Sequence, residues 1–107
     1  MLEKITEIFD SLRERFCTEL TEDWFSTIHF VFSDDGNWTF DVNNGQLEIR
    51  EGLVGEPLSI VKTDKKTFDR VFSGEIPLEM AIMADKFTVD NIVEVFKLQT
   101  VFKKRKL

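Results

Sequence analysis

The sequence predicts a single α+β domain built around an antiparallel meander of strands. Three observations support this fold class. Apolar residues recur at helical spacing near the N-terminus, they alternate with polar residues between Thr27 and Ile49, and helical spacing returns after Asp64. The chain has 107 residues, 42% of them hydrophobic and 32% charged, which suits one soluble domain with one core. We expect the domain to cover residues 1–102 and a basic tail to follow over residues 103–107.

The first expected element is a helix over residues 3–20, with an apolar stripe on one face and charged residues on the other. Cys17 lies at the edge of the stripe. We interpret it as a small half-buried filler, because no base or cation motif accompanies the thiol. A single cysteine forms no internal disulfide, which is compatible with a reducing cytosol. The stripe consists of Ile5, Ile8, Phe9, Leu12, Phe16 and Leu20.

From Thr27 the apolar residues recur with a period of two, which predicts an antiparallel meander. Residues 34–37 and 43–45 are rich in Asp, Asn and Gly and supply its two turns. The alternating residues are Ile28, Phe30, Phe32, Trp38, Phe40, Val42, Leu47 and Ile49.

A break separates the meander from a fourth expected strand, which begins at Leu58 and Ile60 and ends at Thr63. Glycines and a proline interrupt the alternation there. The pair Leu53-Val54 inside the break is either a loop anchor or part of a cavity rim.

The second half of the chain predicts three helices and a fifth strand. Asp64 is a good N-cap for a helix that ends at Ser73-Gly74, and Pro77 suits the first turn of a short helix. Residues 86–89 fit a strand, and we expect Asp90 to cap a last helix. That last helix is apolar around much of its circumference, so it must be covered both by the sheet and by a ligand, a partner or other helices. The expected core includes Ile5, Phe9, Leu12, Phe30, Phe40, Ile49, Ile60, Phe72, Val95 and Phe96.

The charge distribution narrows the partners. The net charge is −6, and the last five residues carry +4, which leaves −10 on residues 1–102. An acidic body repels phosphates, so we expect no nucleic-acid partner. The basic residues Lys103, Lys104, Arg105 and Lys106 suit an anionic membrane surface or an acidic protein. The sequence leads us to expect no signal peptide, no membrane-spanning segment and a cytoplasmic protein.

The sequence offers little that could perform catalysis. His29 is the only histidine and lies on the strand face opposite Ile28 and Phe30, with no motif that supplies a partner. Asp34-Asp35 is interpreted as turn chemistry, because the rest of a calcium loop is missing. We therefore expect neither an enzyme nor a metal or cofactor site.

The order of motifs resembles the sterol carrier protein type 2 family. In that family, a strand and polar N-cap lead into a helix with an apolar residue before Ser-Gly, and alanine and methionine follow at fixed spacing before Lys and an apolar strand. The matching positions here are Asp64, Phe68, Ser73-Gly74, Ala81, Met83, Lys86, Phe87 and Val89. Pro77, Asp85 and the segment before Asp90 depart from the family pattern, so we expect the segment bordering the pocket to be remodelled.

The resemblance implies a mainly antiparallel sheet of five strands with helices packed on one face and an apolar tunnel between sheet and helices. It implies a non-catalytic domain that binds or carries a fatty acyl, acyl-CoA, isoprenoid or sterol-like molecule. The alternative is a closed accessory or scaffold domain that acts through protein–protein contacts, because phenylalanines equally suit a filled core. The expected cavity residues are Phe40, Phe68, Phe72, Met80, Ala81, Met83, Phe87, Val89, Ile92, Val95 and Phe96. Lys86 and Lys97 are the candidates for an anionic head group.

Overall fold

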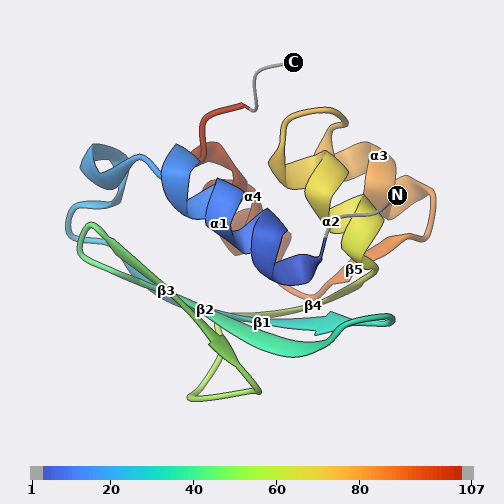
Figure 1. Ribbon diagram of the computed structural model, residues 1–107, viewed down its shortest axis with the longest axis horizontal. Coiled ribbons are helices and arrows are strands. Elements are labelled where there is room, and N and C mark those ends of the chain that lie inside the picture. Colours follow the sequence, from blue (N-terminus) through green and yellow to red (C-terminus); the bar gives the residue numbers. More distant parts are fainter. Residues whose placement is uncertain (1–3, 105–107) are drawn as a thin grey trace.

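The computed structural model describes residues 4–104, in which helices cover one face of a five-stranded sheet (Figure 1). This arrangement confirms the expected α+β class. No helix in the described part of the chain is long and apolar enough to cross a bilayer. The elements in chain order are α1 (Ile5–Arg15), the 3-10 helix η1 (Thr18–Thr21), β1 (Phe25–Phe32), β2 (Gly36–Asn43), β3 (Gln46–Glu51), β4 (Ser59–Thr63), α2 (Lys65–Phe72), α3 (Leu78–Met83), β5 (Phe87–Val89) and α4 (Ile92–Thr100).

The strand order is β3-β2-β1-β4-β5. Strands β1, β2 and β3 form the expected antiparallel meander, with Ile28 opposite Phe40 and Phe40 opposite Ile49. Strand β4 pairs with β1 in parallel, and β5 pairs with β4 antiparallel. The sheet is therefore mainly antiparallel, with one parallel pair at its centre.

The parallel pair requires the chain to cross from the end of β3 to the start of β4, and residues 52–58 do so over the outer face of the sheet. The Thr39 hydroxyl donates to the Gly52 carbonyl at 2.7 Å and accepts from the Val54 amide at 2.9 Å. His29 Nε2 lies 3.0 Å from the Val54 carbonyl oxygen. His29 is therefore only 7% exposed although it lies on the outer face, as expected. The Val54 backbone is the anchor of this loop, while its side chain stays exposed.

The core is a cluster of phenylalanine rings with Phe68 of α2 at its centre. Phe68 is fully buried, and its ring centroid lies 5.2 Å from that of Phe30 and 5.2 Å from that of Phe32. Its ring also contacts Phe9 of α1 edge-on. One ring therefore joins two helices to the inner face of the sheet. The expected core residues that are buried are Ile5, Phe9, Leu12, Phe30, Phe40, Phe72 and Val95.

Three expected core residues lie elsewhere. Ile60 is 38% exposed, because the residues of β4 alternate between its two faces and the buried ones are Ser59, Val61 and Thr63. Phe96 is 48% exposed on the outer side of α4. Ile49 is half-buried on the edge strand β3.

The first helix ends at Arg15, so the prediction that it continues to residue 20 is wrong. Phe16 instead pairs with Phe102 in an antiparallel bridge, and the Cys17 amide donates to the Val101 carbonyl at 2.8 Å. The backbone of Lys103 joins the same pairing by donating to the Arg15 carbonyl at 2.8 Å. This tertiary pairing holds Phe16 in an extended conformation, and Leu20 is left exposed. Residues 105–107 of the predicted basic tail lie outside the described part of the chain.

Helix α2 begins and ends where the sequence predicts. The Asp64 carboxylate accepts from the Thr67 amide at 2.7 Å, which caps the helix. Gly74 follows the helix with a φ of +85°, a conformation that favours glycine. A Cβ atom at Gly74 would also come within 2.6 Å of the Lys104 side chain.

Replacing Phe68 by alanine should lower the free energy of unfolding by about 3–5 kcal/mol, because the deletion leaves a cavity among rings that close on one another. The same change at Phe25, which is 61% exposed on the outer face, should cost less than about 0.5 kcal/mol. Urea unfolding followed by circular dichroism measures both values. Equal losses in the two variants would show that the Phe68 cluster is not the centre of the core.

Candidate functional site

Helices α3 and α4 expose several large apolar side chains to solvent. Met83 is 86% exposed and Val93 is 73% exposed, and Met80, Ile92 and Phe96 are between 43% and 56% exposed. Clustered exposed apolar residues mark a binding site more often than single exposed residues do. The candidate binding surface of the described residues therefore lies on these two helices.

A groove of about 260 Å³ lies between the two helices and is lined by Glu79, Ile92, Val93 and Phe96. We call it the α3–α4 groove. Three of its four lining residues are apolar, and Glu79 is the only charged one. The groove is open to solvent, so a molecule can reach it without passing through the core.

The N-terminal end of α4 is fixed to the start of β4. The Asp90 carboxylate accepts from the Ile60 amide and from the Ser59 hydroxyl, both at 2.8 Å. The prediction that Asp90 caps α4 is therefore wrong. Asn91 is the cap: its side-chain oxygen accepts from the Glu94 amide at 3.4 Å, and its amide group donates to the Leu58 carbonyl at 3.1 Å.

The hydrogen bonds to Asp90 also change its acidity. Donation by the Ile60 amide, and then by the Ser59 hydroxyl, lowers the pKa of the Asp90 carboxyl below its usual value. The charged form is thus the one that fits this junction between strand and helix.

Contacts with Trp24 and with α2 hold the rest of α4 in place. The Trp24 indole donates to the Glu94 carboxylate at 3.1 Å, and the Lys97 ammonium lies 4.6 Å from the centre of the Trp24 ring. Near the end of the helix, the Gln99 side chain donates to the Val71 carbonyl at 3.1 Å. The wall of the groove that α4 forms is therefore held at both ends and at the middle.

The structure divides the expected cavity residues into two groups. One group is buried in the core, Val89 is half-buried, and the other group is exposed on α3 and α4. Two of the exposed residues, Ile92 and Phe96, meet in the α3–α4 groove. The buried group is Phe40, Phe68, Phe72, Ala81, Phe87 and Val95, and the exposed group is Met80, Met83, Ile92 and Phe96. A ligand-binding role for the buried group stays a prediction.

Sequence reasoning missed two lining residues, Glu79 and Val93. The signal for Val93 was present, because an apolar residue next to Ile92 widens the apolar surface of α4 beyond one stripe. Glu79 carries no such signal, since a glutamate in a first helical turn is ordinary.

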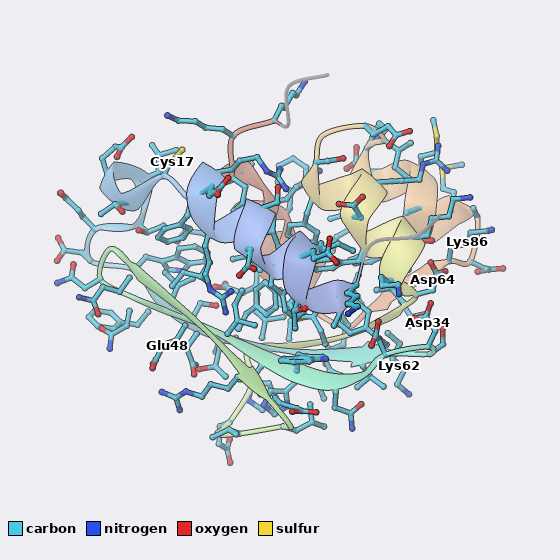
Figure 2. The ribbon with its side chains drawn as sticks, in the orientation of Figure 1. Cys17, Asp34, Glu48, Lys62, Asp64 and Lys86 are labelled. Atoms are coloured by element: carbon cyan, nitrogen blue, oxygen red, sulfur yellow. The ribbon has the colours of Figure 1, made fainter. Side chains whose placement is uncertain are left out.

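The two lysines expected at a ligand head group lie outside the lining of this groove. Lys97 is placed over the Trp24 ring. Lys86 lines a separate groove of about 410 Å³ at one end of the sheet, together with Lys62, Asp64 and other residues. Figure 2 shows Lys62 and Lys86 at this end of the molecule, close to Asp64.

That the segment before β5 is remodelled relative to the family stays a prediction. Asp85, at a position where glycine is common in the family that the sequence resembles, has a φ of +58°. Aspartate is one of the few residues besides glycine that adopt this left-handed conformation at low cost.

The remaining candidate residues have structural contacts. The Asp34 carboxylate accepts from the Lys65 amide at 3.1 Å, and Asp35 forms an ion pair with Lys65 at 3.3 Å, so this turn is joined to the start of α2. Cys17 is buried beside the Phe16 bridge. Within residues 4–104, no three His, Cys, Asp or Glu side chains come together in an arrangement that could hold a metal ion.

One family model matches nearly the whole chain. A family model described as the SCP-2 sterol transfer family matches residues 7–107. No curated protein sequence is significantly similar to the chain.

Solved structures share the fold, among them one enzyme and two sterol carrier proteins. The sec-alkylsulfatase Pisa1 from Pseudomonas sp. matches with a TM-score of 0.83 and 23% identity, over 92% of this chain and 16% of the sulfatase. Sterol carrier protein 2 from Aedes aegypti, in complex with palmitate, matches with a TM-score of 0.68 and 20% identity over 94% of each chain. The apo form of sterol carrier protein 2 from Yarrowia lipolytica matches with a TM-score of 0.63 and 14% identity, over 94% of this chain and 92% of that protein. The chain thus spans about a sixth of the sulfatase and nearly the whole of the two carriers.

Replacing Asp90 by asparagine should lower the melting temperature at neutral pH, and the difference from the wild type should shrink in acid. The folded pKa of Asp90 is below its unfolded value, so its carboxylate stabilises the fold above the unfolded pKa and loses this effect as the pH falls through the folded pKa. Thermal unfolding of both proteins from neutral to acid pH measures the effect. Glu56→Gln, at an exposed carboxylate on the crossover loop, is the control. A difference that stays constant down to acid pH would contradict the assignment to the Asp90 charge.

Proposed function

The chain belongs to the SCP-2 sterol transfer family, and we propose that it is a non-catalytic lipid-binding domain that holds an apolar chain in the α3–α4 groove. The observation that carries this proposal is the placement of Ile92, Val93 and Phe96 around an open groove on a helix that is fixed in place. The sterol carrier protein 2 of Aedes aegypti, which has the same fold, was solved with the single-chain lipid palmitate. That complex supports a ligand with a long apolar chain.

The energetics favour binding at this groove. Burying exposed apolar surface contributes about 25 cal/mol of binding free energy per Å². The apolar side chains of the groove are exposed to solvent, so a bound apolar chain would bury them. Methionine is unbranched and adaptable, so the exposed Met80 and Met83 suit contact with chains of variable shape. A rigid enzyme pocket would instead need converging polar groups.

The centre of the core is a less favourable place for the chain than the groove. The Phe68 ring lies 4.6 Å from Phe72 and 5.9 Å from Phe40, centre to centre. A chain inserted there has to separate rings that already contact one another, and this costs packing energy. We therefore propose that the ligand contacts Ile92 and Phe96 first.

A second candidate function is that of an accessory domain acting through protein contacts. The match to 16% of the sec-alkylsulfatase chain favours it, because a domain of this fold there forms a small part of a longer enzyme. The same exposed residues of α3 and α4 would then contact another protein surface. Lipid binding by the isolated chain distinguishes the two functions.

Replacing Val93 by aspartate should weaken binding of the neutral apolar fluorophore N-phenyl-1-naphthylamine by about tenfold, because it places a charge in the apolar groove. Fluorescence titration of the purified protein measures the affinity. Phe25→Asp is the matched control, because Phe25 is also highly exposed but lies on the opposite face of the sheet. Absence of fluorophore binding to the wild type would favour the accessory domain. An equal loss of affinity in both variants would show that the fluorophore does not bind specifically in the groove.

Replacing Ala81 by phenylalanine tests whether the ligand uses the interior. Ala81 is only 2% exposed, so the larger ring should overpack the core, lower the free energy of unfolding by about 1–3 kcal/mol and leave groove binding intact. Thermal melting and the same fluorophore titration are the measurements. Ala84→Phe is the control at an exposed position just after α3. An Ala81 variant with unchanged melting and no fluorophore binding would place the ligand in an interior tunnel instead.

A further inference from the structure

The charge at the α3–α4 groove is of the wrong sign for a fatty acid. Glu79 is the one charged residue of its lining, and the residue is exposed at the start of α3. Within residues 4–104, no cation forms an ion pair with its carboxylate. A head group that enters the groove therefore meets an unneutralised negative charge.

The cations nearest in sequence are engaged or placed elsewhere. Lys97, one turn along α4 from Val93, lies over the Trp24 ring. Arg70 lies 3.5 Å from the Glu75 carboxylate. Lys86 lines the groove at the end of the sheet and not the α3–α4 groove. None of these three cations lines the α3–α4 groove.

We propose that Glu79 is a specificity-determining residue, which makes the groove select long-chain lipids whose head group donates a hydrogen bond and carries no negative charge. This inference rests on the proposed function of the same groove. An alcohol or an amine donates a charge-assisted hydrogen bond to a carboxylate. A fatty-acid carboxylate donates none and places a second negative charge beside the first, and the net charge of −6 adds to the repulsion. The proposed preference differs from the ligand with which the Aedes aegypti fold relative was solved, the fatty acid palmitate.

Displacement of N-phenyl-1-naphthylamine by dodecanol, dodecylamine and dodecanoate tests the proposal. The three competitors have the same chain length and differ only in the head group. They are compared at neutral pH, below their critical micelle concentrations, with the full 107-residue protein. Dodecanol and dodecylamine should displace the fluorophore from the wild type at concentrations about three- to tenfold lower than dodecanoate. Added salt should narrow the gap for the two charged competitors and change dodecanol little.

Variants separate a local effect of Glu79 from the overall charge. In Glu79→Gln, the three competitors should displace the fluorophore at similar concentrations. In Glu79→Lys, dodecanoate should displace it at the lowest concentration. Glu56→Gln removes the same charge from the crossover loop on the other side of the sheet and should leave the wild-type order unchanged. An equal change in Glu56→Gln and Glu79→Gln would overturn the role of Glu79. Circular dichroism confirms that each variant is folded.

Three other outcomes decide between the proposal and its alternatives. If dodecanoate is the strongest competitor on the wild type and Lys86→Gln or Lys97→Gln weakens it, the lysines bind the head group and the inference about Glu79 is wrong. If the wild type does not bind the fluorophore at all, the proposed lipid-binding function fails, and the inference fails with it. Binding of the fluorophore with no preference among the three head groups would overturn the inference alone.

Discussion

The ring contacts of Phe68 hold the helical layer against the sheet, and the rest of the fold depends on them. Phe68 projects from α2 into the inner face of β1, where Phe30 and Phe32 lie, and it also meets Phe9 of α1. Edge-on aromatic pairs are worth about 0.5–1.5 kcal/mol each beyond the area they bury. Because α1 and α2 close this centre, α3 and α4 need not bury every apolar residue that they carry. The exposed surface of these two helices follows from the position of the core.

The local elements of this fold were largely predictable, because their signals lie within a few residues. The two turns of the meander and the Asp64 cap are set by neighbours in the sequence, and the structure has them where they are expected. The end of α1 was not predictable. The bridge between Phe16 and Phe102 joins distant parts of the chain, and helical periodicity alone cannot show it. The exposure of Ile60 has the same origin, because pairing with β1 decides which face of β4 turns inward.

The site was predictable in kind but not in geometry. The sequence identified Ile92 and Phe96 as apolar residues in excess of a simple stripe, and the structure brings both to one groove. It could not show that Phe40 and Phe72 pack into a closed ring cluster while Met83 faces solvent, since all are apolar residues in amphipathic elements. The positions of the charged residues were still harder to predict from the sequence. Lys97 is taken up by the Trp24 ring, a contact between residues far apart in the sequence, and Glu79 reaches the groove only through the way α3 lies beside α4.

The strand order leaves two edges, and both are poor templates for a further strand. Edge strand β5 has only three residues, and edge strand β3 carries the exposed pair Glu48 and Arg50, which are joined at 2.6 Å. Short strands and charged side chains at a sheet edge discourage pairing with another chain. The sheet is therefore protected from growing by strand addition, although its helical side keeps apolar surface open. Such a domain can expose apolar surface for binding on its helical side, and its sheet edges still do not pair readily with other copies of the chain.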